Sequence, residues 1–166
     1  MMAYGLLLVF PAVMILAALS DLFTLTIPNR LSIILVAVFF PLAFIAGLPL
    51  ETILMHLGAG AGILFIGFLL FTTGTFGGGD AKLLAAASLW VGITPLADFF
   101  FYMALFGGAL AIVVLLYRRV PDVFVVGPAW AQRLHTKGTG IPYGVAISSA
   151  ALLTFPATQL YALIAG

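Results

Sequence analysis

Six runs of apolar residues, separated by short polar segments, fill most of this chain. A helix needs about 20 predominantly apolar residues to cross a bilayer, and most of the runs approach or exceed that length. Of all residues, 64% are hydrophobic and only 7% are charged. The sequence therefore predicts an all-α polytopic membrane protein, with six transmembrane helices in one domain over residues 1–166 of the chain, embedded in a lipid bilayer. The runs cover residues 4–20, 31–48, 52–71, 81–93, 95–117 and 145–165.

The fourth run, residues 81–93, is the shortest. As a helix it measures about 20 Å, which is less than the ~30 Å thickness of the hydrocarbon core. We therefore expect the fourth helix to cross only part of the bilayer, or to begin outside the hydrocarbon.

The composition excludes several functional classes. The chain contains no cysteine, which excludes disulfides, thiolate catalysis and cysteine-ligated zinc. Its net charge of +1 is too small to suggest a nucleic-acid partner. Residues 1–5 contain no basic side chain, so we expect the first run to be a retained helix and not a cleaved signal peptide.

Every lysine and arginine falls in the loops after the first, third and fifth runs or, as Lys82 does, at the edge of such a loop. Because successive loops alternate between the two sides of a membrane, these three loops share one side. The opposite side holds Glu51 and Asp98 and no basic residue. Basic loops stay in the cytoplasm, so we expect a multi-pass protein of the inner (cytoplasmic) membrane with both termini outside. We interpret Arg30, Arg118 and Arg119 as membrane anchors and Lys82 as a residue that sets orientation. The basic residues are Arg30, Lys82, Arg118, Arg119, Arg133 and Lys137.

Two acidic residues, Asp21 and Asp80, lie on the same side as the basic loops, each at the junction of an apolar run and a loop. An acidic residue at a membrane boundary is costly, so a function is the first hypothesis for each. Asp80 has a structural alternative, because it precedes a helical run and could accept backbone N–H groups as an N-cap. Asp21 is harder to explain structurally, because a carboxylate near the C-terminus of a helix is disfavoured by the helix dipole.

The two carboxyls are more informative as a pair. If the first and fourth helices are adjacent, Asp21 and Asp80 can meet in one hydrated cavity. Two carboxyls that share a site do not both ionise easily, so one keeps a proton while the other acts as a base. Aspartic proteases use this arrangement to activate water and to polarise a peptide carbonyl. The helix dipole favours Asp80 as the base and Asp21 as the protonated partner.

Three consecutive glycines, Gly77, Gly78 and Gly79, precede Asp80. Glycine allows close approach of another chain and positive φ, so a substrate peptide or the first helix could lie against this segment. A flexible linker is the alternative interpretation. A phosphate-binding loop is excluded, because an aspartate follows where such a loop needs lysine.

Three motifs in this chain together resemble those of the type IV prepilin peptidases, which are intramembrane aspartic proteases of the GxGD type. The string GxGD alone is weak, but three motifs in family order, each at a predicted cytoplasmic helix boundary, are specific. The resemblance covers nearly the whole chain. The motifs are Asp21 followed by Ile27-Pro28-Asn29, then Gly77-Gly78-Gly79-Asp80-Ala81-Lys82, and finally Gly140-Ile141-Pro142-Tyr143-Gly144.

The resemblance implies a six-helix bundle in which Asp21 and Asp80 form the catalytic dyad. It implies no cofactor and no metal. The substrates would be pilin-like precursors, cut on the cytoplasmic side of their hydrophobic segment, typically just after a glycine. Larger members of this family carry an extra cytoplasmic region, often with paired cysteines, that methylates the new N-terminus. Here the loop between the first two runs is short and cysteine is absent, so the chain resembles the peptidase-only branch associated with tight-adherence (Flp) pili, or the archaeal preflagellin peptidases, and methyl transfer is not expected.

We interpret Gly77, Gly78, Gly79, Pro142, Tyr143 and Gly144 as substrate-binding residues. Pro142 fixes φ and lacks a donor, and Gly144 permits an unusual backbone angle. Together they could interrupt the start of the last helix and leave free carbonyls for an extended substrate. The alternative is a proline that simply begins the helix.

Two other functional classes stay open. Membrane carboxylates and broken helices also occur in proton- or ion-coupled transporters, although these bind at the midplane and often show inverted repeats, which we do not find. A structural membrane subunit of a pilus or secretion complex is the other alternative. The sequence leaves a monomer and a homodimer equally open.

Overall fold

The computed structural model describes residues 2–165, and this part of the chain is entirely helical. Its α-helices form a bundle, and two short 3₁₀ segments, Asp122–Phe124 and Phe155–Ala157, lie in connections. No strand occurs within residues 2–165. The α-helices are α1 (Met2–Leu7), α2 (Val9–Thr24), α3 (Asn29–Ile45), α4 (Leu50–Thr72), α5 (Gly78–Val91), α6 (Leu96–Tyr117), α7 (Ala129–His135), α8 (Tyr143–Thr154) and α9 (Gln159–Ala165).

The helices follow the six apolar runs, and the prediction of an all-α polytopic membrane protein is confirmed. Three helical segments are long and apolar enough to cross a bilayer: Ala3–Thr24, which joins α1 and α2, and the helices α4 and α6. The last run forms α8 and α9, which meet at a bend of 54° and are together long and apolar enough to count as a fourth candidate span. The remaining two runs are the shorter helices α3, of 17 residues, and α5, of 14 residues.

The short helix α5 lies inside the bundle and is surrounded by the others. It packs against α3, α4 and α8, and every residue from Leu83 to Val91 is buried. Trp90 Nε1 donates a hydrogen bond of 2.9 Å to Leu35 O of α3, and His56 Nδ1 of α4 bonds Leu89 O at 2.7 Å. These bonds cross between helices, so they fix the depth of α5, and with it the position of Asp80 at its N-terminal end.

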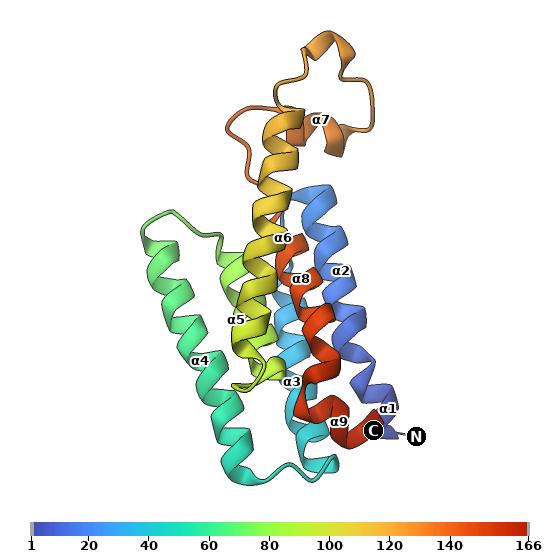
Figure 1. The fold of residues 1–166 in the computed structure, drawn as a ribbon, viewed down its shortest axis with the longest axis vertical. Helices are drawn as coiled ribbons and strands as arrows, with labels where there is room; N and C mark the ends of the chain where they lie inside the picture. The colour runs from blue at the N-terminus through green and yellow to red at the C-terminus, as the bar shows by residue number, and fades with distance from the viewer. Residues whose placement is uncertain (1, 166) are drawn as a thin grey trace.

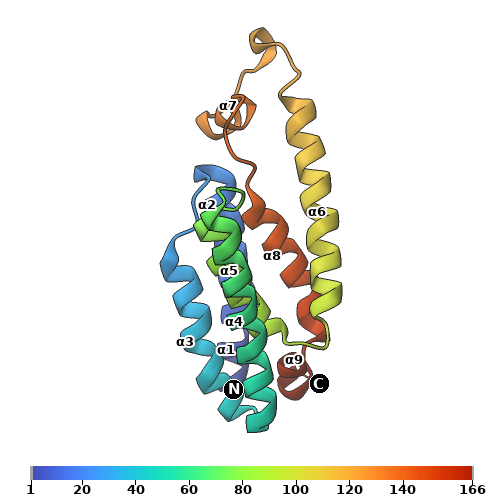
Figure 2. The same cartoon turned by 90° about the vertical axis from the view of Figure 1, so that its left-hand side faces the viewer.

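Figures 1 and 2 show how the helices surround α5. In Figure 1, α4 lies on one side of the bundle and α1 and α2 on the other. In the view of Figure 2, α3 and α6 form opposite edges, and α2, α5 and α8 lie between them. The helices α2 and α5 each pack against both α3 and α8. The carboxyls of Asp21 on α2 and Asp80 on α5 therefore meet between α3 and α8. Extensive packing of α2 directly against α5 is not needed for this.

The basic side chains gather at one end of the bundle. They lie at the start of α3, in the first turn of α5, after α6 and around α7, and Figure 1 shows α7 at the top and both termini at the bottom. Glu51 and Asp98 are in the first turns of α4 and α6, at the opposite end. The charge asymmetry is thus a property of the fold, and the membrane side that each end faces stays a prediction.

Candidate active site

Asp21 lies in the last turn of α2 and is 5% exposed. The helix ends at Leu25, which adopts φ 53° and whose N–H donates to Asp21 O at 2.8 Å. Leu25 is the one non-glycine residue with positive φ among the described residues. This left-handed residue turns the chain sharply toward Pro28, which precedes α3. Asp21 therefore stands at a tight helix–helix corner, as its position before a turn signal predicts.

The carboxyl of Asp21 is bonded to a segment that is distant in the sequence. The backbone N–H of Gly144, in the first turn of α8, donates a hydrogen bond of 2.7 Å to Asp21 Oδ2. A Cβ atom at Gly144 would lie 2.8 Å from the same oxygen and 2.7 Å from Ile27 Cδ1. Only glycine leaves room for this contact.

Asp80 is the third residue of α5, and its side chain turns back over Gly77. The N-cap position belongs to Gly77, so the interpretation of Asp80 as an N-cap is not supported. Asp80 Oδ1 is buried, and no residue that the structure describes gives it a hydrogen bond. A buried polar atom without a partner is costly, so this oxygen is free to bind water or a substrate.

The three glycines provide space for neighbouring groups and are not a flexible linker. A Cβ atom at Gly77 would collide with Asp80 Oδ2, and one at Gly79 would lie 3.2 Å from Ile27 Cβ. A Cβ atom at Gly78 would lie 3.3 Å from the ring of Phe71. The expectation of positive φ is wrong here, because the glycines with positive φ among the described residues are Gly47, Gly74, Gly92 and Gly138. The same correction applies to the unusual backbone angle expected at Gly144.

Ile27 joins the two halves of the site. Its side chain fills the space between Gly79 and Gly144, beside Asp21. The carboxyl of Asp21 is close enough to Asp80 to repel its negative charge. The structure thus brings five residues together around Ile27: Asp21, Asp80, Gly77, Gly79 and Gly144. Ile27 belongs to a sequence motif, but sequence analysis assigns it no role.

The segment before α8 begins a helix and does not interrupt one. Pro142 is buried at the N-cap position of α8, and the ring of Tyr143 faces Gly107 of α6. The expectation of free carbonyls is wrong: Ile141 O accepts the N–H of Tyr143 at 2.8 Å, and Pro142 O accepts that of Val145 at 3.1 Å. Of the residues in this segment, Gly144 has the direct contact with the dyad.

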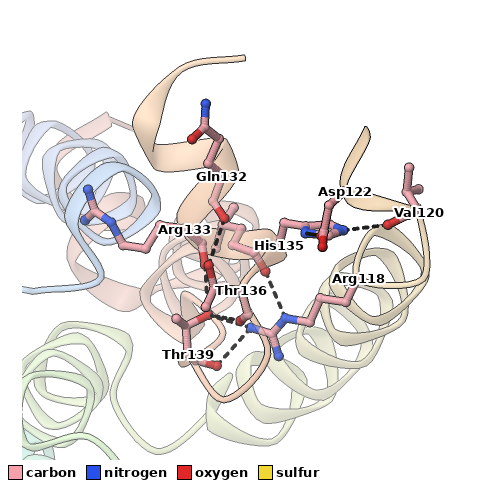
Figure 3. Close-up of polar contacts among 9 residues, drawn as sticks. Arg118, Val120, Asp122, Gln132, Arg133, His135, Thr136 and Thr139 are labelled. Atoms are coloured by element: carbon pink, nitrogen blue, oxygen red, sulfur yellow. Dashed lines mark hydrogen bonds and ion pairs between the residues drawn. The ribbon is translucent and has the colours of Figure 1, made fainter. Parts of the chain in front are cut away.

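Arg118 holds the same segment in place, a role that sequence analysis missed. Its Nε donates to Leu134 O at 2.8 Å, and its Nη2 donates to Thr139 O at 2.8 Å and to Gly140 O at 3.1 Å. Figure 3 shows the guanidinium reaching from α6 into the loop, next to the contact between His135 and Asp122, whose Nδ1 and Oδ1 are 3.4 Å apart. Arg118 is therefore more than a membrane anchor. Nothing in the sequence distinguishes Arg118 from the adjacent Arg119, so neither motif nor spacing signals this role.

Within residues 2–165, no group of three or more histidine, cysteine, aspartate or glutamate side chains lies close enough together to hold a metal ion. The chemistry that the site itself offers is that of two neighbouring carboxyls. One of them accepts a backbone N–H, and the other has an oxygen without a partner among the described residues. Such a pair can remove a proton from water and supply another to a carbonyl oxygen.

Comparisons with known proteins identify the family of this chain. The family model of the type IV leader peptidase family matches residues 8–112, a range that includes Asp21 and Asp80 but not Gly144. The chain is 36% identical over 124 residues to the prepilin leader peptidase/N-methyltransferase of Bacillus subtilis (strain 168). That match covers 70% of this chain and 48% of the relative, so the chain spans about half the length of the relative. No solved structure matches the chain. From the family match over most of its length, together with the paired carboxyls at one end of its helical bundle, the chain belongs to the type IV leader peptidase family.

Proposed function

We propose that this protein is an aspartic endopeptidase that removes the leader peptide of type IV prepilin-like (Flp or pseudopilin) precursors at the cytoplasmic face of the inner membrane. The observation that carries the proposal is the meeting of Asp21 and Asp80, from the first and fourth helical runs, at one end of the bundle. Their position at an end, away from the middle of the helices, favours a peptidase over a transporter with a midplane site.

The hydrogen bonds suggest how the two carboxyls divide the work. Asp21 Oδ2 accepts the N–H of Gly144, and a hydrogen bond donated to a carboxylate favours its charged form. Asp80 Oδ1 has no donor among the described residues, so the shared proton is better placed there. Asp21 then acts as the base and Asp80 as the acid, the reverse of the assignment that the helix dipole alone favours.

The proposed reaction needs only water and the two carboxyls. Asp21 takes a proton from water while the resulting hydroxide forms a bond to the carbonyl carbon of the peptide. Asp80 gives its proton to the carbonyl oxygen. When the C–N bond of the tetrahedral intermediate breaks, the leaving nitrogen takes the proton that Asp21 holds, and one hydroxyl of the intermediate returns a proton to Asp80. The products are the carboxylic acid and the amine, and the dyad regains its starting state.

The membrane orientation rests on the basic side chains around α7 and the start of α3, because basic loops stay in the cytoplasm. The end of the bundle that carries the dyad would then face the cytoplasm, with both termini outside. The connection between α2 and α3 consists only of residues 25–28. The larger members that this chain resembles carry an extra cytoplasmic region for methylation, and this chain has a short connection here and no cysteine, so we propose peptidase activity without methyl transfer.

The proposal is tested by incubating the purified protein, in detergent or lipid, with a candidate precursor and sequencing the N-terminus of the product. We expect one new N-terminus, on the cytoplasmic side of the hydrophobic segment of the precursor. An intact precursor, with a parallel sample of a known leader peptidase cutting it, would contradict the proposal.

A further inference from the structure

A groove of about 590 Å³ runs along the bundle beside the candidate active site. Its floor belongs to α5, and its walls are α3 and α4, both of which pack against α5. Two of the wall residues, Ile33 and Leu64, are 63% and 46% exposed, so the groove is open on the side that faces lipid.

The groove is polar at one end and apolar along the rest of its length. Asn29, Ser32 and Lys82 line the end near the start of α3 and α5, where the dyad lies. Farther along the groove, Phe40 of α3, Leu57 of α4 and Leu89 of α5 line it. A segment that fits this groove therefore has a polar end at the same end of α5 as Asp80 and an apolar body that extends into the membrane.

Small side chains leave room for a backbone to approach closely. Ala85 and Ala86 form part of the floor, and Ala37 and Ala61 belong to the walls. Gly60 is already used within the bundle, because a Cβ atom there would lie 3.1 Å from Leu89 Cβ. In a membrane, helices associate through such small residues, since lipid offers no hydrophobic driving force between them.

Ser32 indicates that the occupant is a polypeptide. It is 8% exposed and lines the groove, and its hydroxyl has no hydrogen-bond partner among the described residues. At the same end, Lys82 Nζ donates to Asn29 Oδ1 at 3.0 Å, and a lysine ammonium has two further donors. A lipid acyl chain offers no acceptor to these groups, whereas a peptide that leaves its helical conformation near the cleavage site offers free carbonyls.

We propose that this groove binds the apolar helix of the precursor, with the N-terminal end of that helix at Ser32 and Lys82 and the bond to be cut beside Asp80. The inference rests on the proposed function and identifies how its substrate is held. Lys82 follows Asp80 by two positions in α5, so the two side chains lie on different faces of this helix. The peptide chain that leaves the groove would therefore pass over the N-terminal end of α5 to reach the dyad.

Filling the groove tests the proposal. Ala37 and Ala61 are exposed in the free protein and line the groove, so Ala37→Phe and Ala61→Phe obstruct it with little effect on the bundle. We expect KM for a full precursor to rise about tenfold or more, while a short peptide with the cleavage site but no apolar helix is cut as by the wild type. Ala109→Phe, at an exposed position of α6 outside the groove, is the matched control and should change neither value.

Unchanged cleavage of the full precursor by both filled variants would overturn the proposal and indicate that lipid occupies the groove. An equal loss with the short peptide would also overturn it, because the substitutions would then act on the dyad itself. If the wild type cuts neither the full precursor nor the short peptide, the proposed peptidase function itself is contradicted. These outcomes separate failure of the groove from failure of the peptidase.

Cross-linking provides a second measurement with milder substitutions. Because the chain has no native cysteine, a single Ala61→Cys substitution can form a disulfide, on oxidation, only with a cysteine placed in the precursor helix or with a second copy of the variant, and the mass of the product distinguishes the two. We expect this cross-link in an Asp80→Asn background, which keeps the substrate uncut, and not from the matched Ala109→Cys. Cross-linking from Ala109→Cys alone would place the substrate on α6 and contradict the proposal. Ser32→Ala should lower kcat/KM for the precursor severalfold without lowering thermal stability.

Discussion

Gly144 and Asp21 are 123 positions apart in the chain, and the backbone N–H of Gly144 donates a hydrogen bond of 2.7 Å to Asp21 Oδ2. This bond attaches the start of α8 to the end of α2 at the dyad. The family match ends at residue 112, so a segment outside the matched region completes the surroundings of Asp21. The activity of this protein should therefore depend on α8 as well as on the two aspartates.

Gly144→Ala tests that dependence. The new Cβ atom would lie 2.7 Å from Ile27 Cδ1 and 2.8 Å from Asp21 Oδ2, so either the helix or the carboxyl must move. We expect kcat/KM to fall by roughly 100-fold, the cost of displacing a catalytic group by about 1 Å. Gly108→Ala is the control, because a Cβ atom there meets nothing within 4 Å. Full activity of the Gly144 variant would show that the close contact is not required.

Alanine substitutions at the three consecutive glycines should have unequal effects. At Gly77 a Cβ atom collides with Asp80 Oδ2, and at Gly78 it meets only the outer edge of the Phe71 ring at 3.3 Å. A side chain can rotate away from an added methyl group, whereas Asp80 cannot leave the site without loss of function. We expect Gly77→Ala to abolish cleavage and Gly78→Ala to retain most of it, as measured by initial rates on one precursor. Equal losses would favour a general need for flexibility in this segment.

Arg118→Ala should loosen the segment that carries Gly144. The guanidinium donates to backbone oxygens of Leu134, Thr139 and Gly140, and these bonds have no replacement after truncation. We expect cleavage to slow by roughly tenfold, through a less well positioned α8, and limited proteolysis between residues 120 and 140 to become faster. The neighbouring Arg119→Ala removes an equal charge from an exposed side chain and should leave both rates unchanged.

Trp90→Phe tests the attachment of α5 to α3. The substitution keeps an aromatic ring in a fully buried position but removes the hydrogen bond from Nε1 to Leu35 O. We expect a loss of about 1 kcal/mol in the free energy of unfolding, measured by denaturation in a mild detergent. An unchanged stability would mean that packing alone holds α5 at its depth.

Hydropathy predicts the helices of this fold well, because membrane thickness sets the length of each apolar run. The ends of α2 and α5 follow from Asp21, Pro28 and the glycines before Asp80, so the two carboxyls are predictable as residues of one membrane side. Hydropathy does not determine which helices are neighbours. For this reason neither the central position of α5 nor the groove beside it is visible in the sequence.

The sequence is also ambiguous about why a residue is present. A glycine serves either positive φ or close packing, and the structure assigns Gly77, Gly79 and Gly144 to close packing. From the sequence, Arg118 resembles a membrane anchor. Its three backbone acceptors lie 16 to 22 positions away along the chain, so its contacts with them cannot be predicted locally. Contacts of this kind depend on the path of a loop, for which local sequence gives no period or spacing.

The most direct measurement is the cleavage rate of one precursor by three single variants, each purified in a folded, membrane-inserted form. Asp21→Asn and Asp80→Asn keep the shape of the side chain and remove its ability to exchange a proton, so each should lower the rate by at least about 1,000-fold. Asp98→Asn, at an exposed acid of the opposite end of the bundle, should cleave like the wild type. Substantial cleavage by either the Asp21 or the Asp80 variant would contradict the dyad.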